Sequence, residues 1–457
     1  MRPVLVLDIP GLSPDRIGEH TPNLRRLAED GFQAVLEPVL PAVTCPVQAT
    51  ILTGRLPREH GIVGNGWYFR DLAEIWFWRQ SNHLVSGEKV WEKGRRRDAR
   101  FTCAKLFWWY AMYASADWSV TPRPIYPADG RKIPGIYAQP PELEEILDRA
   151  LGTFPLFEFW GPRAGIRSSE WIAGAARIVL ERFRPTLTLV YLPHLDYDFQ
   201  RRGPRFPGAE AELRAVDRVA GSLIDAARGL GAEAVALSEY AIVPVSGSVS
   251  VNRFLRREGL LAVRERLGRE LLDAGASRAF AVADHQVAHA YVRREEDIPP
   301  VRRALESLEG VDLVLDREGQ AAFGLDHPRS GELVLVAKPD RWFDYYYWLD
   351  ERKAPDFAPT VDIHRKPGYD PAELFFDDSR MFPRLRAARK LLASRLGFRT
   401  LFDVVPTSAE RVRGSHGRLP SSPGEGPVLV SSSRRQAASR LAATEVADLL
   451  LDTVFSA

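Results

Sequence analysis

Short apolar runs alternate with amphipathic segments along much of the chain. Residues 4–7 form an all-apolar run that ends in Asp8 and then an Ile-Pro-Gly turn, which predicts a buried strand followed by a turn. Residues 21–31 carry apolar side chains at helical spacing, with Thr21 as a capping residue and Gly31 as a terminator. We therefore expect a strand followed by a helix at the start of the chain.

The same order of elements returns twice further along. Residues 169–192 read as an amphipathic helix followed by an apolar strand, and residues 209–238 repeat this order. Strands that alternate with helices predict an α/β fold with a mostly parallel central sheet flanked by helices. Ligands of such sheets gather at the carboxyl ends of the strands, where we expect Asp8, the 194–200 segment and Glu239.

Two stretches between these elements have a different composition. Seven of the eleven tryptophans lie between Trp67 and Trp118, which favours a tryptophan-rich satellite core with one or two rings lining a pocket. A second stretch contains an expected hairpin around residues 279–292 and another aromatic cluster. We predict core segments over 1–66, 151–260 and 351–457, a Trp-rich cap over 67–150 and a second insert over 261–350.

Composition and charge narrow the class of protein. The 457 residues are 45% hydrophobic and 27% charged, which suits a globular protein with a large core. The formal net charge of +2 predicts no general attraction to a nucleic acid duplex, so any preference for anions must be local. No apolar run is long enough to span a membrane, and Asp8 interrupts the first one too early for a secretory signal. The only cysteines are Cys45 and Cys103, which are too few for a disulfide framework and suit a reducing compartment. We therefore expect a cytoplasmic protein.

The most informative segment lies at residues 40–65. It places Thr44 just before Pro46, at the start of a short helix that ends at Gly54. A hydroxyl at that point meets free backbone N–H groups and the helix dipole, which favour a phosphate-like anion. A lone threonine there is normally a helix cap. The wider pattern P-x-x-T-x-P-x-x-x-T-x-x-T-G, followed by His-Gly-Ile and Asn65, resembles the nucleophile segment of the type I phosphodiesterase/nucleotide pyrophosphatase family of the alkaline phosphatase superfamily.

The resemblance implies a role for each matching residue. Asp8 matches a metal-binding aspartate at the end of the first strand, and Thr44 matches the nucleophile. Asn65 matches an amide that binds a phosphoryl oxygen, with the backbone N–H of Cys45 as a second donor. Asp196 matches the aspartate of a later metal-binding motif. The family uses two divalent metal ions with these groups.

The chain departs from the family where two metal-binding histidines are expected. Gln200 stands at one histidine position, and Glu239 and Tyr240 stand at an Asp-His pair. One ion would then be held by Asp8, Thr44 and Glu239, and the other by Asp196, a histidine and Gln200. Tyr240 is also included among the expected metal ligands. Because oxygen ligands replace imidazoles, the site should favour manganese, magnesium, iron or calcium over zinc.

Four histidines compete for the missing imidazoles. His416, in a Gly-Ser-His-Gly turn, is the first choice for metal binding, and His364 is the second, with a substrate-facing role as its alternative. His194 shares a face with Asp196 if the segment is extended, and is otherwise a capped loop histidine. The pair at 284–285 mimics the missing Asp-His motif but follows it by about 45 residues, inside an expected hairpin, so we do not count it as a ligand.

These features together predict a metal-dependent hydrolase of a small-molecule phosphate ester. The resemblance implies cleavage of a phosphodiester or pyrophosphate bond through a covalent phosphoryl intermediate on Thr44. A phosphonate or sulfate ester hydrolase on the same scaffold is one alternative. A degenerate member that binds an anion without turnover is another, favoured by the lost ligands at Gln200, Glu239 and Tyr240. Retention of Asp8, Thr44, Asn65 and Asp196 favours an active enzyme.

Overall fold

The central element of the structure is a nine-stranded sheet. The computed structural model describes residues 1–379 and 382–456. The sheet has the strand order β21-β2-β20-β9-β1-β8-β5-β6-β7, and β1 at its centre pairs in parallel with both β8 and β9. The strands are β1 (Val4–Asp8), β2 (Phe32–Glu37), β5 (Cys103–Leu106), β6 (Trp118–Pro122), β7 (Ile136–Gln139), β8 (Leu187–Tyr191), β9 (Glu233–Leu237), β20 (Val428–Ser431) and β21 (Arg440–Ala442). The predicted α/β class with a mostly parallel sheet is confirmed.

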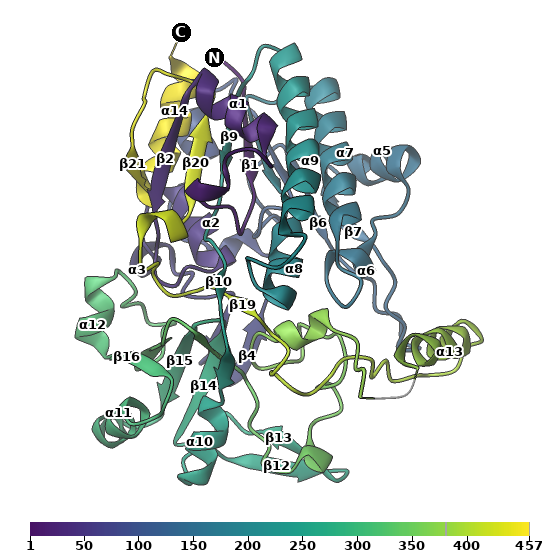
Figure 1. Ribbon diagram of the computed structural model, residues 1–457, viewed down its shortest axis with the longest axis vertical. Helices are drawn as coiled ribbons and strands as arrows, with labels where there is room; N and C mark the ends of the chain where they lie inside the picture. Colours follow the sequence, from purple (N-terminus) through teal and green to yellow (C-terminus); the bar gives the residue numbers. More distant parts are fainter. Residues whose placement is uncertain (380–381, 457) are drawn as a thin grey trace.

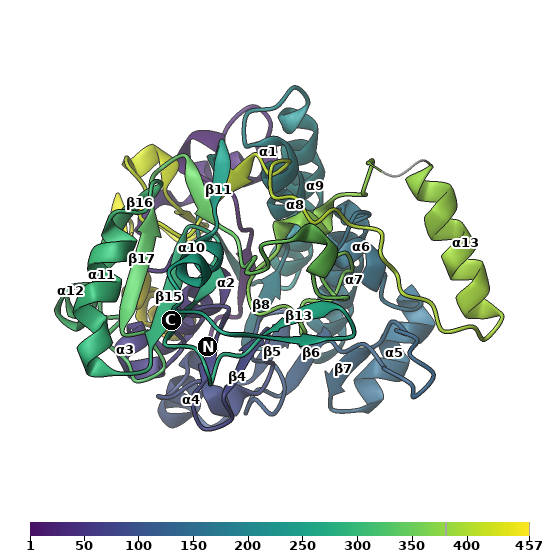
Figure 2. The same ribbon diagram turned by 90° about the horizontal axis from the view of Figure 1, so that it is seen from below.

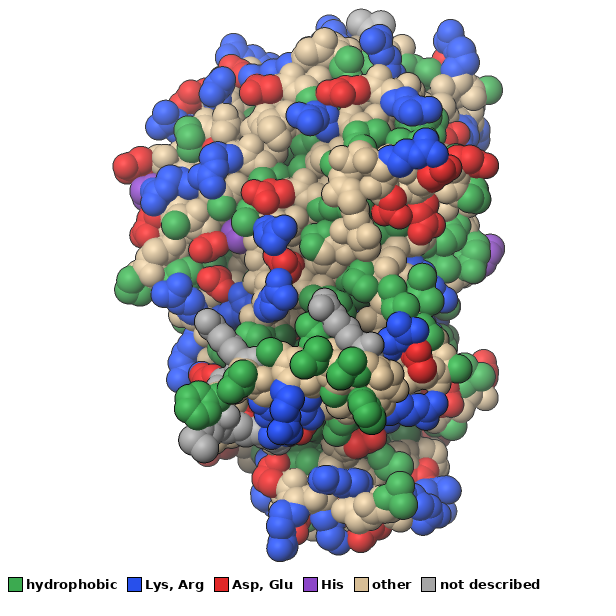
Figure 3. Space-filling view, turned by 90° about the vertical axis from the view of Figure 1, so that its right-hand side faces the viewer, with side chains coloured by type: hydrophobic (Ala, Val, Ile, Leu, Met, Phe, Trp, Pro, Cys, Tyr) green, Lys and Arg blue, Asp and Glu red, His purple; other side chains and the backbone are tan. Residues whose placement is uncertain are grey.

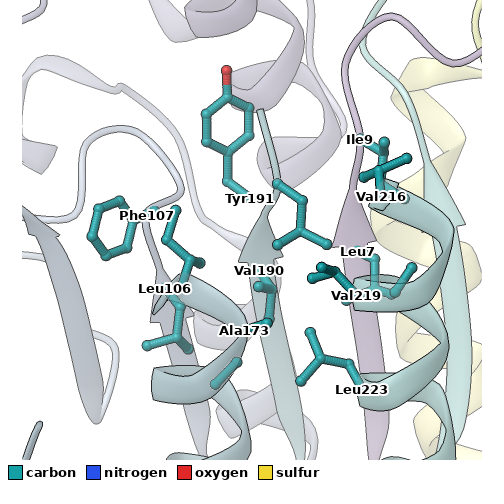
Figure 4. Close-up of a cluster of buried hydrophobic side chains, with 14 of the residues drawn as sticks. Leu7, Ile9, Leu106, Phe107, Ala173, Val190, Tyr191, Val216, Val219 and Leu223 are labelled. Atoms are coloured by element: carbon teal, nitrogen blue, oxygen red, sulfur yellow. The ribbon is translucent and has the colours of Figure 1, made fainter. Parts of the chain in front are cut away.

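Helices cover both faces of this sheet, which explains why its central strands are apolar throughout. Leu5 and Leu7 of β1 join one buried cluster, whereas Val4 and Val6 join another on the opposite face. The first face is covered by α1 (Pro22–Asp30), α7 (Ile166–Phe183) and α9 (Ala209–Gly229). The second is covered by α2 (Thr44–Thr53), α4 (Val90–Arg97) and α14 (Val446–Phe455). Figure 4 shows side chains of α9 packed against Leu7 and Val190 on the first face.

A second, antiparallel sheet of four strands lies below the first in Figure 1. Its order is β14-β15-β17-β16, and the sheet has its own buried cluster. The expected hairpin is β14 and β15, which pair across a turn at residues 285–286. The strands and their helices are β14 (Ala279–Asp284), β15 (Val287–Val292), β16 (Val311–Leu315), β17 (Leu333–Ala337), α11 (Ile298–Glu306) and α12 (Arg317–Ala322).

Short elements connect the two sheets. β10 (Val243–Pro244) pairs with β19 (Gly414–Ser415), and this pairing brings a late segment of the chain beside the end of the central sheet.

Several tryptophans of the Trp-rich stretch are buried: Trp67, Trp91 and Trp108 are among the largest fully buried side chains. The remaining elements are α3 (Pro57–His60), β3 (Gly66–Phe69), β4 (Glu74–Phe77), α5 (Glu142–Leu151), α6 (Leu156–Phe159), α8 (His194–Arg202), β11 (Gly247–Val249), α10 (Val251–Arg257), β12 (Val263–Arg266), β13 (Arg269–Leu272), β18 (Arg341–Phe343) and α13 (Pro383–Arg395).

The described helices are also informative about membrane insertion. Within residues 1–379 and 382–456, each helix is too short or too polar to cross a bilayer.

Candidate active site

Two carboxylates meet at the carboxyl ends of neighbouring strands. β1 ends at Asp8, and Glu239 follows β9 by two residues, so the parallel pairing of these strands brings both side chains to one edge of the sheet. Both are fully buried. Gln48 donates a hydrogen bond to Asp8 Oδ2 at 2.9 Å. Within the described residues, Asp8 Oδ1 and both carboxylate oxygens of Glu239 accept no well-formed hydrogen bond.

Burial controls the charge of these two groups. It raises the pKa of Asp8 to about 7 because a charged carboxylate is poorly solvated there. Burial also raises the pKa of Glu239 well above its usual range, and the neighbouring Asp8 adds to this effect more than the nearby Thr44 hydroxyl opposes it. Two adjacent carboxylates with three unpartnered oxygens form a site that is complete only when protons or a cation are bound.

Thr44 is the first residue of α2, with Val43 as the capping residue. The predicted helix is confirmed, and it ends at Gly54, whose φ of 70° is the left-handed conformation that glycine adopts most easily. The Thr44 side chain is buried, and its hydroxyl oxygen lies 3.1 Å from Tyr240 Oη. The hydroxyl therefore lies between the Asp8–Glu239 pair and Tyr240.

Asn65 and the Cys45 backbone, the expected phosphoryl donors, are bonded to groups of the protein. The Cys45 N–H donates to Asn65 Oδ1 at 2.9 Å. Asn65 in turn donates to Asp284 through its backbone N–H at 2.7 Å and its side-chain amide at 3.1 Å. The single proton of the Cys45 N–H is thus engaged, whereas the Asn65 amide retains a second proton for another acceptor. Burial raises the pKa of the Cys45 thiol, so this group stays protonated.

The segment around Asp196 is helical, which corrects one sequence prediction. Residues 194–202 form α8 rather than an extended run, so Asp196 and Gln200 share a face one turn apart. His194 points elsewhere: its Nε2 lies 2.8 Å from Glu212 Oε2 of α9. The predicted common face of His194 and Asp196 was wrong because the helical period, not the period of two, applies after Pro193.

Tyr240 occupies the centre of the second half of the site. Its ring stacks on His416 with centroids 3.5 Å apart and planes at 5°. Its hydroxyl bonds to Thr44 and donates to Asp196 Oδ1 at 3.4 Å. Burial raises the pKa of Asp196 to about 7. Tyr240 thus links the Thr44 hydroxyl to a carboxylate on another element.

His416 and Gln200 complete this second half. His416 Nδ1 lies 2.9 Å from the Ala42 carbonyl oxygen, and its Nε2 has no hydrogen-bond partner in the described part of the chain. Its Nε2 lies 3.9 Å from Asp196 Oδ1. Gln200 Oε1 accepts a hydrogen bond from Tyr369 Oη at 2.8 Å, so this amide oxygen is already engaged.

The hairpin pair at 284–285, which the sequence analysis did not count as a metal ligand, lies beside the other residues of the site. His285 has a φ of 60° at the β14–β15 turn, and its ring lies 3.6 Å from Tyr369 and 3.8 Å from His416, measured between centroids. Its Nδ1 is 2.8 Å from Asp284 Oδ1. Sequence reasoning also missed Tyr369 as a site residue. The Asp-His pair was a usable signal, but its position in a hairpin hid the fact that the turn reaches the central sheet.

His364 lies in a different place from the other predicted residues. It lines a cavity of about 620 Å³ together with Trp76 and Arg264. Burial and the neighbouring Lys132 lower its pKa to about 4. The structure therefore does not bring His364 together with Asp196 and His416.

The two halves of the site differ in what they can hold. No group of three or more His, Cys, Asp or Glu side chains among the described residues is arranged to hold a metal ion. Asp8 and Glu239 nevertheless offer three oxygens without a well-formed hydrogen bond in the described part of the chain, and the Thr44 hydroxyl lies beside them; this oxygen set suits one hard divalent cation. In the other half, Asp196 accepts from Tyr240 and Gln200 accepts from Tyr369, and the described His, Cys, Asp and Glu side chains add no third ligand to Asp196 and His416, fewer than catalytic metal sites use. That donor set does not fit a second cation.

Comparison with known proteins agrees with the arrangement of these elements. A family model described as type I phosphodiesterase / nucleotide pyrophosphatase matches residues 4–370. An uncharacterized pyrophosphatase/phosphodiesterase of Schizosaccharomyces pombe is 26% identical over 256 residues, which are 53% of this chain and 45% of that protein. The chain thus spans less than half the length of the curated relative that it matches.

Solved structures share the fold over almost the whole chain. Phosphonoacetate hydrolase from Sinorhizobium meliloti 1021, in complex with phosphonoformate, has a TM-score of 0.61 at 17% identity and covers 99% of this chain and 96% of its own. Murine ectonucleotide pyrophosphatase / phosphodiesterase 5, in an inactive form in complex with AMP, has a TM-score of 0.60 at 13% identity and covers 99% and 95%.

Proposed function

The chain belongs to the type I phosphodiesterase/nucleotide pyrophosphatase family, and on that premise we propose that it hydrolyses a phosphodiester, pyrophosphate or phosphonate bond of a small molecule with Thr44 as the nucleophile. One observation carries this proposal. The Thr44 hydroxyl, at the first turn of α2, lies between a carboxylate pair and a tyrosine that bonds to a third carboxylate. The AMP and phosphonoformate complexes of the structural neighbours support a small anionic substrate.

We propose that one divalent cation binds to this site. Asp8, Glu239 and the Thr44 hydroxyl would hold it, where it would lower the pKa of the hydroxyl and offset charge on the phosphoryl oxygens. The oxygen donors favour manganese, magnesium, iron or calcium over zinc. The second cation implied by the resemblance has no comparable donor set, so our proposal contains one cation where the sequence suggested two.

Tyr240 supplies a path for the proton of Thr44. Its single hydroxyl proton is directed to Asp196, so its oxygen can accept the proton of Thr44. As Thr44 Oγ1 bonds to phosphorus and the bond to the leaving group breaks, the Thr44 proton moves to Tyr240 and the Tyr240 proton moves to Asp196. Tyr240 stays neutral throughout, in keeping with the raised pKa that burial gives it.

The second step reverses this transfer. Water attacks the phosphorus of the Thr44 ester, and the bond between phosphorus and Thr44 Oγ1 breaks. The proton on Asp196 returns through Tyr240 to the Thr44 oxygen. The water supplies the new P–OH group of the product, and its second proton passes to solvent, where it balances the anionic leaving group released in the first step. The remaining Asn65 amide proton is available to a phosphoryl oxygen in both steps.

A non-catalytic anion-binding role is the second candidate. It is favoured by the engagement of the Cys45 N–H with Asn65, which removes one of the two expected phosphoryl donors. The hydrolase remains the better-supported function because the Thr44–Tyr240–Asp196 chain has the connectivity of a nucleophile and its base.

The test is turnover of a panel of activated substrates. Wild-type protein with manganese or magnesium is incubated with aryl esters of phosphate (mono- and diesters), phosphonate and sulfate, and with phosphonoacetate. We expect the diester or a phosphonate to be hydrolysed with a kcat/KM at least about tenfold above that of the sulfate. The Thr44→Ala variant is the matched control. Binding of these anions without turnover of any of them would support the second candidate and refute the hydrolase.

A further inference from the structure

Helix α13 (Pro383–Arg395) projects from the body of the molecule. Figures 1 and 2 show it standing clear of both sheets at the side nearest to α5 and α6. Large apolar side chains around it are exposed to between 46% and 68%, namely Phe382, Leu385, Leu391, Leu392, Leu396 and Phe398. Contiguous exposure of such residues is uncommon on a monomeric protein and marks an interaction surface.

Three of the exposed leucines, Leu385, Leu392 and Leu396, are seven and four residues apart and form a leucine stripe along one side of the helix. Arg389 follows Leu385 by four residues and lies on the same side, whereas Leu391 lies on another side. Polar contacts tie this helix to the segment that follows it: Arg386 and Lys390 form ion pairs with Asp403, and Lys390 donates a hydrogen bond to the Leu401 carbonyl oxygen.

The charge of this segment has a single sign. Residues 382–402 contain six Lys and Arg residues and no Asp or Glu. The first acidic residue is Asp403, which pairs with Arg386 and Lys390. Figure 3, in which this side faces the viewer, shows hydrophobic side chains interspersed with Lys and Arg side chains around α13. The whole chain has a formal net charge of only +2, so the residues outside this segment carry a small net negative charge and the positive charge is local.

We propose that residues 382–402, which we call the α13 surface, bind the anionic surface of a phospholipid bilayer. An exposed helix that combines leucines with interspersed basic side chains lies in the plane of the interface, its leucines among the acyl chains and the charged ends of its long basic side chains near the head groups. A second copy of the chain is a poorer occupant, because it would bring six positive residues against six others. The inference does not depend on the proposed hydrolase activity.

The test is flotation of the full-length protein with vesicles. We expect vesicles with about 30% phosphatidylserine to bind at least about tenfold more protein than vesicles of phosphatidylcholine alone. Binding should fall in about 0.5 M NaCl, because salt shortens the range of the attraction between charges. Equal binding to both vesicles, or no binding to either, would overturn the proposal.

Matched variants locate the surface. The triple variant Leu385→Asp, Leu392→Asp, Leu396→Asp should lose at least about tenfold in vesicle binding. Leu267→Asp is the control, because Leu267 is fully exposed in the β12–β13 turn and lies outside the α13 surface. Circular dichroism should show both variants folded. An unchanged triple variant would overturn the proposal, as would a wild-type dimer in sedimentation that the triple variant loses, because the stripe would then bind a second copy.

Discussion

The two halves of the candidate site differ in the partners that their buried carboxylates have. Asp8 and Glu239 form a buried carboxylate pair in which three oxygens lack a well-formed hydrogen bond among the described residues. Asp196 is also buried, but it accepts a hydrogen bond from the Tyr240 hydroxyl, and Tyr369 donates one to the neighbouring Gln200. One half therefore needs protons or a cation, whereas the other is largely completed by side chains of the protein.

This difference is the basis of our proposal of one cation where the resemblance implies two. Tyr240 lies between Thr44 and Asp196 and stacks on His416, so a neutral hydroxyl with one proton connects the groups that a second cation would otherwise bridge. A hydrogen-bonded proton can transfer between these groups, whereas a bound cation stays with its ligands. The cost is weaker stabilisation of charge on the substrate, since a neutral donor offsets less of it than a divalent ion.

The largest effect is expected at Thr44, which contacts both halves. Thr44→Ala should lower kcat/KM for an aryl phosphodiester by about 10³-fold or more, since no other hydroxyl takes its place, and Thr44→Ser should retain part of the rate. Steady-state kinetics with manganese measure this. Cation-induced thermal stabilisation should persist in the Ala variant, because Asp8 and Glu239 remain. Undiminished turnover in Thr44→Ala would remove Thr44 from the reaction.

The second-largest effect is expected at Tyr240, where replacement by Phe removes the hydroxyl and keeps the ring. Tyr240→Phe keeps the stacking on His416 but breaks the path from Thr44 to Asp196, so we expect kcat to fall by about 10²- to 10⁴-fold. KM and manganese affinity should stay near those of the wild type. A kcat equal to that of the wild type would show that the proton leaves Thr44 by another path.

Paired substitutions test the comparison directly. Glu239→Gln removes a charge from the half that lacks partners, so manganese affinity should weaken by at least about tenfold in calorimetric titration. Asp196→Asn changes the half that Tyr240 completes and should alter the affinity by less than about threefold. Equal losses in the two variants, with two manganese ions bound per wild-type chain, would contradict our distinction between the halves.

The smallest effect is a pH-dependent shift in melting temperature. Burial raises the folded-state pKa of Asp8 from 3.8 to about 7, so between these values the folded state keeps a proton that the unfolded state has lost. Stability of the chelated protein should therefore fall as pH rises from about 4 to 7.

A cation should reverse this loss where the carboxylates are ionised. We expect manganese to raise the melting temperature by about 3 °C or more at pH 8 and by less at pH 5, where it must displace protons. Differential scanning calorimetry measures both. Glu239→Gln is the control and should respond less at pH 8. A larger stabilisation by manganese at pH 5 than at pH 8 would contradict binding of the cation to ionised Asp8 and Glu239.

Sequence reasoning located the parts of the site that depend on one element. Asp8 follows an apolar run and Thr44 precedes a short helix, so local pattern alone puts the first at a strand end and the second at a helix start. Thr44 and Asn65 belong to the same short segment of the chain, so the sequence pattern that identifies Thr44 also identifies Asn65. The direction of the His194 side chain was not predicted correctly, because the pattern of residues 194–200 fits both a helix and an extended run and does not distinguish them.

The sequence by itself determined the α/β class and the kinds of residue at the strand ends, because buried strands and amphipathic helices leave periodic patterns in any chain. Only the tertiary structure decided which distant groups meet there. The hairpin turn with Asp284 and His285 reaches Asn65 and His416, and Tyr240 bonds to Thr44 and Asp196. These contacts join separate elements, and their distances depend on how two sheets pack, which no local pattern records.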